Sequence, residues 1–121
     1  MKILIAEDET LMLKTLEMKL QREGYEIVCC ADGREALQKL EEEQPRLVIT
    51  DIMLPYSSGL EIIRAAKAKP YQVFVIVLSA MGQEKTVEEA FELGADDYMT
   101  KPFNLNELAI RVKRLAAKII V

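Results

Sequence analysis

Two hydrophobic patterns alternate along this chain, and their alternation limits the folds that it can adopt. Short apolar runs of the kind that form buried strands come first, and each is followed by apolar residues at the spacing of one helix face. Glycine or proline follows four of the helical stretches, as is typical where a helix ends. No linker, repeat or low-complexity tract interrupts the pattern. The apolar runs lie at residues 3–6, 27–30, 47–50, 73–78 and 98–100.

Successive strand–helix units predict a single α/β domain over residues 1–121, built on a doubly wound, five-stranded parallel sheet with helices on both faces. The first, third and fourth runs are almost purely apolar, as strands covered on both faces must be. Glu26 precedes the second run, and Asp96 and Asp97 precede the fifth, which indicates two edge strands. We therefore expect the strand order 2-1-3-4-5 of flavodoxin-like folds, in which ligands bind between the first and third strands.

Three of the predicted helices begin with a capping-box pattern, in which a small polar residue precedes a glutamate by three positions. The small side chain should accept a hydrogen bond from a free N–H of the first helical turn. Structural roles are therefore expected for these pairs, which are Asp32 with Glu35, Ser58 with Glu61 and Asn104 with Glu107.

Composition excludes several classes of function. The net charge of −4 argues against nucleic-acid binding by this domain, which would need a concentrated basic face. The absence of histidine removes imidazole metal sites. No apolar run approaches the roughly 20 residues that span a membrane, and the first strand follows Met1 and Lys2 without a signal peptide, so we expect a cytoplasmic protein. Adjacent Cys29 and Cys30 should be free thiols, because a bridge between them would be strained.

Polar side chains stand at the ends of four of the predicted strands. Because the carboxyl ends of parallel strands share one edge of a sheet, these side chains should converge. Oxygen ligands favour Mg²⁺ or a similar hard ion, while a lysine and a hydroxyl suit the oxygens of a phosphoryl group. An aspartate that takes a phosphoryl group becomes an acyl phosphate, which makes Asp51 the candidate nucleophile. The full set is Glu7, Asp8, Asp51, Ser79 and Lys101.

Each of these residues also has an ordinary structural explanation. Glu7 and Asp8 could favour the dipole of the first helix, and Asp51 could be a turn residue. A serine or a lysine after a strand is usually a loop hydroxyl or a solvated charge. Their coincidence at four strand ends of one sheet favours the functional interpretation.

Four segments together resemble the receiver domains of bacterial two-component response regulators, the CheY-like family. They span nearly all of the chain and are highly specific in combination. The sequence of these segments is most similar to the subfamily with a C-terminal winged-helix DNA-binding domain, which serves as its effector. We expect residues 1–121 to hold the receiver domain without an effector domain. The segments are residues 3–9 (ILIAEDE), 51–55 (DIMLP) followed by Gly59, 78–80 (LSA), and 94–98 (GADDY) leading to 101–103 (KPF).

The resemblance implies a phosphoacceptor switch rather than an enzyme with turnover. A sensor histidine kinase would donate a phosphoryl group to Asp51 in a step that depends on Mg²⁺, and only slow self-dephosphorylation would follow. Carboxylates and one backbone carbonyl would hold the ion, and a lysine and a hydroxyl would contact the phosphoryl oxygens. The implied metal set is Glu7 (through water), Asp8, Asp51 and the carbonyl of Met53, and the implied catalytic set is Asp51, Lys101 and Ser79.

The family also implies a conformational change. Ser79 would move toward the phosphoryl group and Tyr98 would follow into the vacated space, which changes the face formed by the fourth helix, fifth strand and fifth helix. Tyr98 is equally consistent with an ordinary half-buried aromatic of an edge strand. By resemblance, the peptide bond between Lys101 and Pro102 should be cis.

In the winged-helix subfamily that face forms a two-fold dimer with charge pairs across it. Asp97 with Arg111 and Glu92 with Lys113 match the pattern, while Val87 replaces a further basic partner. Exposed ion pairs contribute only about 0–1 kcal/mol each, so solvated charges explain these residues equally well. A homodimer through this face is therefore a candidate assembly. The expected output is transcription regulation through an effector domain absent from this chain, and the alternative is a stand-alone receiver that acts by protein–protein interaction.

Two other phosphate-related functions fit less well. Aspartyl-phosphate phosphohydrolases carry a second carboxylate two residues after the nucleophile, where this chain has Met53. Nucleotide- and flavin-binding domains of this topology use a glycine-rich first loop, whereas residues 7–10 are acidic. Met53 and Met81 flank the expected phosphoryl site, and neither can orient an attacking water. The hypothesis is therefore an acyl phosphate that lasts minutes or more.

Overall fold

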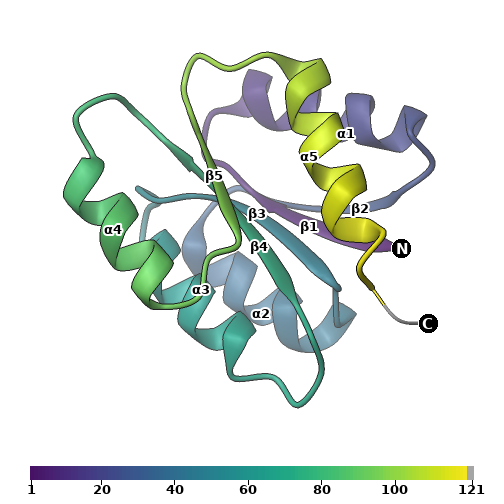
Figure 1. The fold of residues 1–121 in the computed structure, drawn as a ribbon. Helices are drawn as coiled ribbons and strands as arrows, with labels where there is room; N and C mark the ends of the chain where they lie inside the picture. The colour runs from purple at the N-terminus through teal and green to yellow at the C-terminus, as the bar shows by residue number, and fades with distance from the viewer. Residues whose placement is uncertain (120–121) are drawn as a thin grey trace.

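The computed structural model describes residues 1–119, in which strands and helices alternate as predicted (Figure 1). Residues 120 and 121, the last two of the predicted domain, lie outside the described residues. The strands are β1 (Lys2–Ala6), β2 (Glu26–Cys30), β3 (Leu47–Asp51), β4 (Phe74–Ser79) and β5 (Asp97–Thr100). The helices are α1 (Thr10–Arg22), α2 (Gly33–Glu43), α3 (Gly59–Lys67), α4 (Glu84–Glu92) and α5 (Leu105–Ala116).

The strands form one parallel sheet in the order β2-β1-β3-β4-β5, which confirms the predicted flavodoxin-like topology. The three central strands are buried along almost their whole length, whereas β2 and β5 have exposed positions. Burial on both faces explains why the central strands are continuously apolar. Asp51 and Ser79 are the last residues of β3 and β4, so the sheet itself fixes both.

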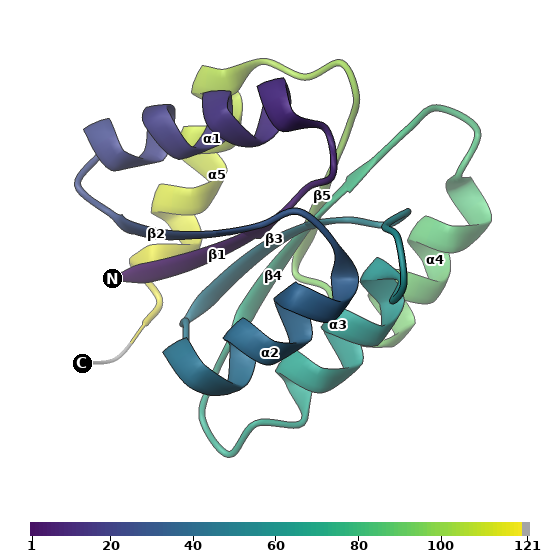
Figure 2. The same ribbon diagram turned by 180° about the vertical axis from the view of Figure 1, so that it is seen from behind.

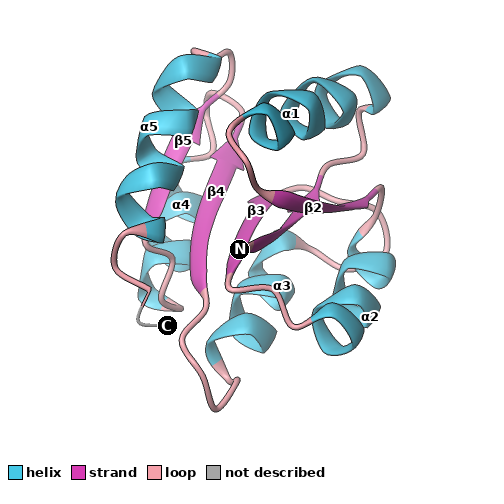
Figure 3. Ribbon diagram, turned by 90° about the vertical axis from the view of Figure 1, so that its right-hand side faces the viewer, coloured by secondary structure: helices cyan, strands magenta, loops and turns pink. Residues whose placement is uncertain are grey.

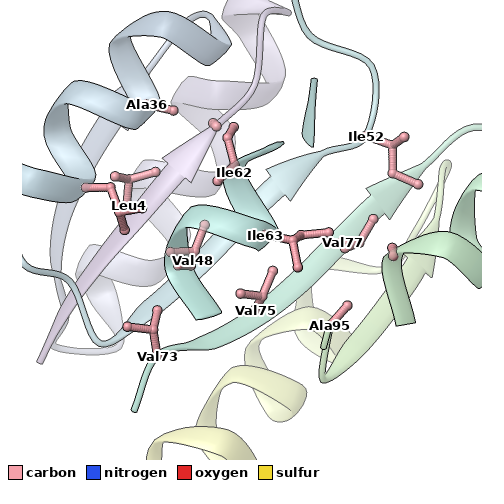
Figure 4. Close-up of a cluster of buried hydrophobic side chains, with 14 of the residues drawn as sticks. Leu4, Ala36, Val48, Ile52, Ile62, Ile63, Val73, Val75, Val77 and Ala95 are labelled. Atoms are coloured by element: carbon pink, nitrogen blue, oxygen red, sulfur yellow. The ribbon is translucent and has the colours of Figure 1, made fainter. Parts of the chain in front are cut away.

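Helices α1 and α5 cover one face of the sheet, and α2, α3 and α4 cover the other (Figures 1 and 2). Figure 3 shows the sheet between these two helical layers. Each layer has its own apolar core, because successive strand residues point to opposite faces. In the core drawn in Figure 4, Val48, Val75 and Val77 of the sheet pack with Ile62 and Ile63 of α3. Burial of each such side chain contributes about 1.5–3 kcal/mol, which holds the strand ends in a fixed arrangement.

Two of the three predicted caps form. Asp32 accepts a hydrogen bond from the N–H of Glu35 at 2.8 Å, and Asn104 accepts one from Glu107 at 3.1 Å. The third prediction is wrong, because the Ser58 side chain makes no capping bond. Backbone carbonyls replace it: the N–H of Gly59 bonds the carbonyl of Ile52 at 2.8 Å, and that of Glu61 bonds the carbonyl of Ser58 itself at 3.1 Å.

The two cysteines are free, as predicted, with Cys30 buried and Cys29 partly buried. Burial raises the pKa of each thiol to about 12, which keeps both in the unreactive protonated form at neutral pH. Within residues 1–119, no helix combines the length and apolar character needed to cross a membrane.

Candidate functional site

The predicted polar residues lie at the carboxyl-terminal edge of the sheet. Glu7 and Asp8 follow β1, Asp51 ends β3, Ser79 ends β4 and Lys101 follows β5. The chain leaves β1 for the edge strand β2 and leaves β3 for β4 on the other side, so the sheet order reverses between β1 and β3. Open α/β sheets bind ligands at such a point. Glu7, Asp51 and Ser79 are buried, Lys101 is partly exposed and Asp8 is exposed.

The ammonium group of Lys101 joins two of the carboxylates. Its Nζ donates to Oε1 of Glu7 at 2.5 Å and to Oδ2 of Asp51 at 2.6 Å. Short distances are typical of hydrogen bonds between ionised groups. The side chain therefore points inward, as the predicted site requires, and the peptide bond to Pro102 is cis, as expected. The direct bond to Glu7 was not predicted.

The carboxylates form a compact acidic cluster. One oxygen from each of Glu7, Asp8 and Asp51 lies within 4.8 Å of the others. The N–H of Met53 donates to Oδ1 of Asp51 at 3.1 Å, so the backbone after β3 folds back toward the same carboxylate. Sequence reasoning missed this bond, although an aspartate in a turn often accepts from the N–H two residues on.

The donor set fits a hard divalent cation. Three carboxylates at this separation repel one another, and a single ammonium group offsets only part of their charge. Mg²⁺ is usually held by one or two carboxylates together with water and substrate oxygens. The oxygen-rich edge around Asp51 matches that requirement.

Burial shapes the titration of this cluster. It raises the pKa of Glu7 above its ordinary value of 4.5, although hydrogen bonds from Lys101 and the Glu9 N–H oppose the shift. Burial also works against the charged form of Lys101, but hydrogen bonds to Asp51 and Glu7 outweigh it and raise the lysine pKa above 10.5. The lysine is therefore charged at neutral pH, while burial opposes ionisation of Glu7.

A cavity of about 490 Å³ lies next to the site, between the loop after β4, helix α4 and strand β5. Its lining includes both predicted switch residues, Ser79 and Tyr98. Tyr98 is 42% exposed, and its ring meets that of Phe91 edge-on with the centroids 5.6 Å apart. The cavity offers space beside both side chains, and their movement stays a prediction.

The residues of the predicted dimer face lie on α4, β5 and α5, and one predicted pair forms within the chain. Arg111 donates to Oδ1 of Asp97 at 2.7 Å, and Arg114 donates to Oδ2 at 3.1 Å. Glu92 and Lys113 are exposed. Asp97 thus has partners inside the monomer, and the dimer stays a prediction.

Comparison with known proteins decides the family. A family model described as the response regulator receiver domain matches residues 3–113. The chain belongs to the response regulator receiver family. It is 40% identical over 114 residues, 94% of its length, to the alkaline phosphatase synthesis transcriptional regulatory protein PhoP of Bacillus subtilis (strain 168). That match covers 48% of PhoP, so this chain spans about half the length of its curated relative.

Solved receiver domains have the same fold. A CheY-like response regulator receiver domain from Methanospirillum hungatei JF-1 matches with a TM-score of 0.90 and 31% identity, covering 97% of this chain and 94% of the other. The structure described as the BeF3-activated DrrB receiver domain matches with a TM-score of 0.86 and 38% identity, covering 96% and 97%.

Membership of the family fixes the general chemistry of this receiver domain. Receiver domains act as phosphoacceptor switches rather than classical enzymes, and response regulators are phosphorylated by histidine kinases. Receiver domains also bind Mg²⁺ at an acidic pocket, and this chain has an acidic cluster of Glu7, Asp8 and Asp51.

Proposed function

We propose that this receiver domain, residues 1–121, takes one phosphoryl group from a sensor histidine kinase onto Asp51. The observation that carries the proposal is the position of the Asp51 carboxylate, which ends a buried central strand, accepts a hydrogen bond from the Lys101 ammonium group and lies in one cluster with the carboxylates of Glu7 and Asp8. An oxygen of Asp51 would form a bond to phosphorus as the bond from phosphorus to the histidine nitrogen breaks. Transfer would be stoichiometric, because no further carboxylate stands at Met53 to drive hydrolysis.

Mg²⁺ would be held by Asp8, Asp51 and the carbonyl oxygen of Met53, with Glu7 acting through water. When bound, the ion supplies positive charge that spreads the negative charge of the transferring group. The Nζ of Lys101 lies 2.6 Å from Oδ2 of Asp51, so its ammonium group is already close enough to stabilise negative charge on an oxygen of the transferred phosphoryl group. The hydroxyl of Ser79, one residue beyond the Asp51 partner Leu78 on the adjacent strand, would donate to another oxygen.

Intact mass after incubation with Mg²⁺ and a small acyl-phosphate donor tests this assignment. The wild-type chain is expected to gain one phosphate, whereas Asp51→Asn gains none. Asp96→Asn, which alters a carboxylate at the opposite edge of the sheet, is the matched control and should gain one phosphate. A wild-type chain that stays unmodified would contradict the proposal, as would full modification of Asp51→Asn.

The resulting aspartyl phosphate should persist for minutes or more without a phosphatase. Met53 and Met81 are 62% and 80% exposed beside the carboxyl-terminal edge, and a thioether neither activates nor orients water as a carboxylate or amide does. Decay of the acyl phosphate can be followed by intact mass after the donor is removed. Loss within seconds would overturn this part of the proposal.

Phosphorylation would then alter the face formed by α4, β5 and α5, through Ser79 and Tyr98. The cavity beside both residues supports the proposal, since a ring can move inward only where there is space. If the active arrangement of this face is the minor one without phosphate, the phosphoryl group needs to favour it by only a few kcal/mol to make it the major one. The likeness to PhoP, whose name describes a transcriptional regulatory protein, supports transcription regulation as the output, through an effector domain outside this chain.

The same face would form a homodimer, with Glu92 and Lys113 paired across it. Sedimentation with and without beryllofluoride, a phosphoryl analogue, tests this dimer. We expect the chain to dimerise when the analogue is bound. Lys113→Glu should weaken the dimer, and the double reversal Glu92→Lys with Lys113→Glu should restore it. A chain that stays monomeric at high concentration with beryllofluoride would contradict the dimer.

A further inference from the structure

The connection between β3 and α3, residues 52–58, contains a strained turn. The N–H of Ser57 donates to the carbonyl of Pro55 at 2.9 Å, which closes a turn of three residues around Tyr56. Tyr56 has a φ of 71°, in the left-handed region that residues with a side chain rarely adopt. Turns of this kind are uncommon and strained, and a strained residue persists only where its surroundings hold it. Met53, the proposed carbonyl ligand of the metal, belongs to this connection.

The first turn of α2 holds the strained turn from one side. The N–H of Gly33, the first residue of α2, donates to the same carbonyl of Pro55 at 3.0 Å. The first N–H groups of a helix have no partner inside the helix, so this bond satisfies one of them. Helix α2 is thereby attached directly to the backbone of the β3–α3 connection.

The contact at Gly33 is too close for any side chain. A Cβ atom added there would lie 1.8 Å from the carbonyl oxygen of Ser57 and 2.8 Å from the Ser57 Cβ. Glycine has no Cβ, so the backbone of Ser57 can approach it closely. An alanine would displace the connection by an amount on the order of 1 Å before reaching normal van der Waals separation.

Arg34 makes a second contact with the turn. Its guanidinium carbon lies 4.2 Å from the centroid of the Tyr56 ring, which is a close cation–π geometry. Tyr56 is 74% exposed, so this stacking occurs on the surface and replaces the burial that normally fixes an aromatic ring. Two successive residues of α2 therefore hold two successive parts of the same turn.

The opposite end of the connection is held by the start of α3. A Cβ atom at Gly59 would lie 2.3 Å from the carbonyl oxygen of Asp51, and the N–H of Gly59 bonds the carbonyl of Ile52 at 2.8 Å. Gly59 thus brings the two ends of the connection together, and Gly33 holds its middle at Pro55 and Ser57, so the segment has little freedom. The N–H of Met53 lies between these attachments and bonds Asp51.

We propose that Gly33 and Arg34 are positioning residues for phosphoryl transfer. By holding the turn at Tyr56, they fix the position of the Met53 carbonyl oxygen. The inference rests on the proposed function of Asp51 and adds that α2 helps to shape the metal site. Mg²⁺ demands near-ideal geometry from its ligands, and a displacement of about 1 Å in a reacting site can cost on the order of a hundredfold. Loosening the turn should therefore weaken the dependence on Mg²⁺ before it changes the fold.

The test measures two quantities over a range of Mg²⁺ concentrations: the rate of Asp51 phosphorylation by a small acyl phosphate and, without the donor, the backbone amide NMR shifts of Asp51 and Met53, which report Mg²⁺ binding itself. Arg34→Ala, an exposed change, should raise the half-saturating Mg²⁺ concentration about two- to fivefold, the loss expected for one exposed cation–π contact, and leave the rate at saturation nearly unchanged. Arg34→Lys and Tyr56→Phe retain a cation and a ring, so both should stay close to wild type.

Gly33→Ala should raise the half-saturating Mg²⁺ concentration about tenfold or more, since it moves the backbone itself. Circular dichroism of this variant serves to check that it is folded before the rates are compared. Arg46→Ala is the matched control. The guanidinium carbon of Arg46 lies 5.8 Å from the centroid of the Tyr71 ring, but this pair is at the amino-terminal end of β3, away from the proposed metal site.

The outcomes separate the two proposals. A wild-type dependence on Mg²⁺ in Arg34→Ala and in folded Gly33→Ala would overturn the positioning role while Asp51 remains the phosphoacceptor. An equal shift in Arg46→Ala would also overturn it, since the effect would not then be specific to the turn. A wild-type chain that accepts no phosphate at all would overturn both proposals.

Discussion

A lysine–aspartate pair lies at each end of the strands, one at the amino-terminal edge of the sheet and one at the carboxyl-terminal edge. The two pairs differ in the balance of charge around them. Near the amino-terminal ends of β4 and β5, Asp96 accepts from the ammonium group of Lys67 and from the N–H of Val75, both at 2.8 Å. Lys67 also donates to the carbonyl of Val73 at 2.8 Å. One carboxylate meets one ammonium group, and the surrounding backbone groups are bonded as well. This edge is a structural attachment between α3, β4 and β5.

At the carboxyl-terminal edge the charges do not balance. Lys101 lies against both Glu7 and Asp51, and the carboxylate of Asp8 completes a cluster within 4.8 Å. Breaking a balanced pair costs stability, whereas an excess of negative charge costs stability while it is present and favours any cation that relieves it. The comparison teaches that the imbalance, and not the lysine–aspartate contact, distinguishes a reactive site from an attachment.

The largest contrast should appear when the two lysines are each replaced by methionine. Lys101→Met should slow phosphorylation of Asp51 by about a hundredfold or more, which is the usual loss when one group that stabilises transferring charge is removed. Lys67→Met should leave the rate within about twofold of wild type at a temperature where it is folded. Initial rates with a small acyl phosphate provide the measurement. Equal losses in the two variants would remove the distinction between the edges.

Stability should change in opposite directions at the two edges. Asp96→Asn should lower the free energy of unfolding by about 1 kcal/mol, because it leaves the Lys67 ammonium group without its carboxylate partner. Asp8→Asn should raise it by roughly 0.5 kcal/mol in the absence of divalent cations, as replacements of unfavourable active-site groups often do. Urea unfolding in EDTA measures both. A destabilised Asp8→Asn would mean that the cluster is already compensated.

Much of this contrast follows from the sequence, because it depends on patterns that are local in the chain. Apolar runs fix which segments are strands, and the parallel topology then brings the residues after β1, β3 and β5 to one edge. The convergence of Asp8, Asp51 and Lys101 needed no knowledge of individual contacts. The strand order was predictable for the same reason, since the edge strands β2 and β5 begin with acidic residues whereas the central strands are almost purely apolar.

The remaining contacts join residues whose distance in space is not encoded by spacing. The bond between Lys101 and Glu7 depends on how deeply both are buried, and a role through water had been expected for Glu7. The contact of Gly33 with Ser57 depends on the packing of α2 beside the β3–α3 connection. Asp97, predicted to pair across a dimer, pairs within the chain because β5 runs beside α5.

A smaller effect should appear in the pH dependence of stability. The folded-state pKa of Glu7 is raised above 4.5, so ionisation is harder in the folded than in the unfolded chain. Relative to Glu7→Gln, the wild type should therefore lose stability as the pH rises above about 4.5, until the pH passes the raised pKa and the difference becomes constant. Urea unfolding of both proteins across this range measures the difference. A wild type that gains on the variant with rising pH would contradict the sign of the shift.

The central claim is that the excess of carboxylates at one edge forms a specific magnesium site, and backbone amide NMR tests it most directly. A Mg²⁺ titration should produce saturable shifts that are largest at Asp8, Asp51, Met53 and Lys101, and that disappear in Asp8→Asn. Shifts that fail to saturate, or that centre on the acidic residues 41–43 at the end of α2, would contradict the claim, because the ion would then recognise surface charge rather than this edge of the sheet.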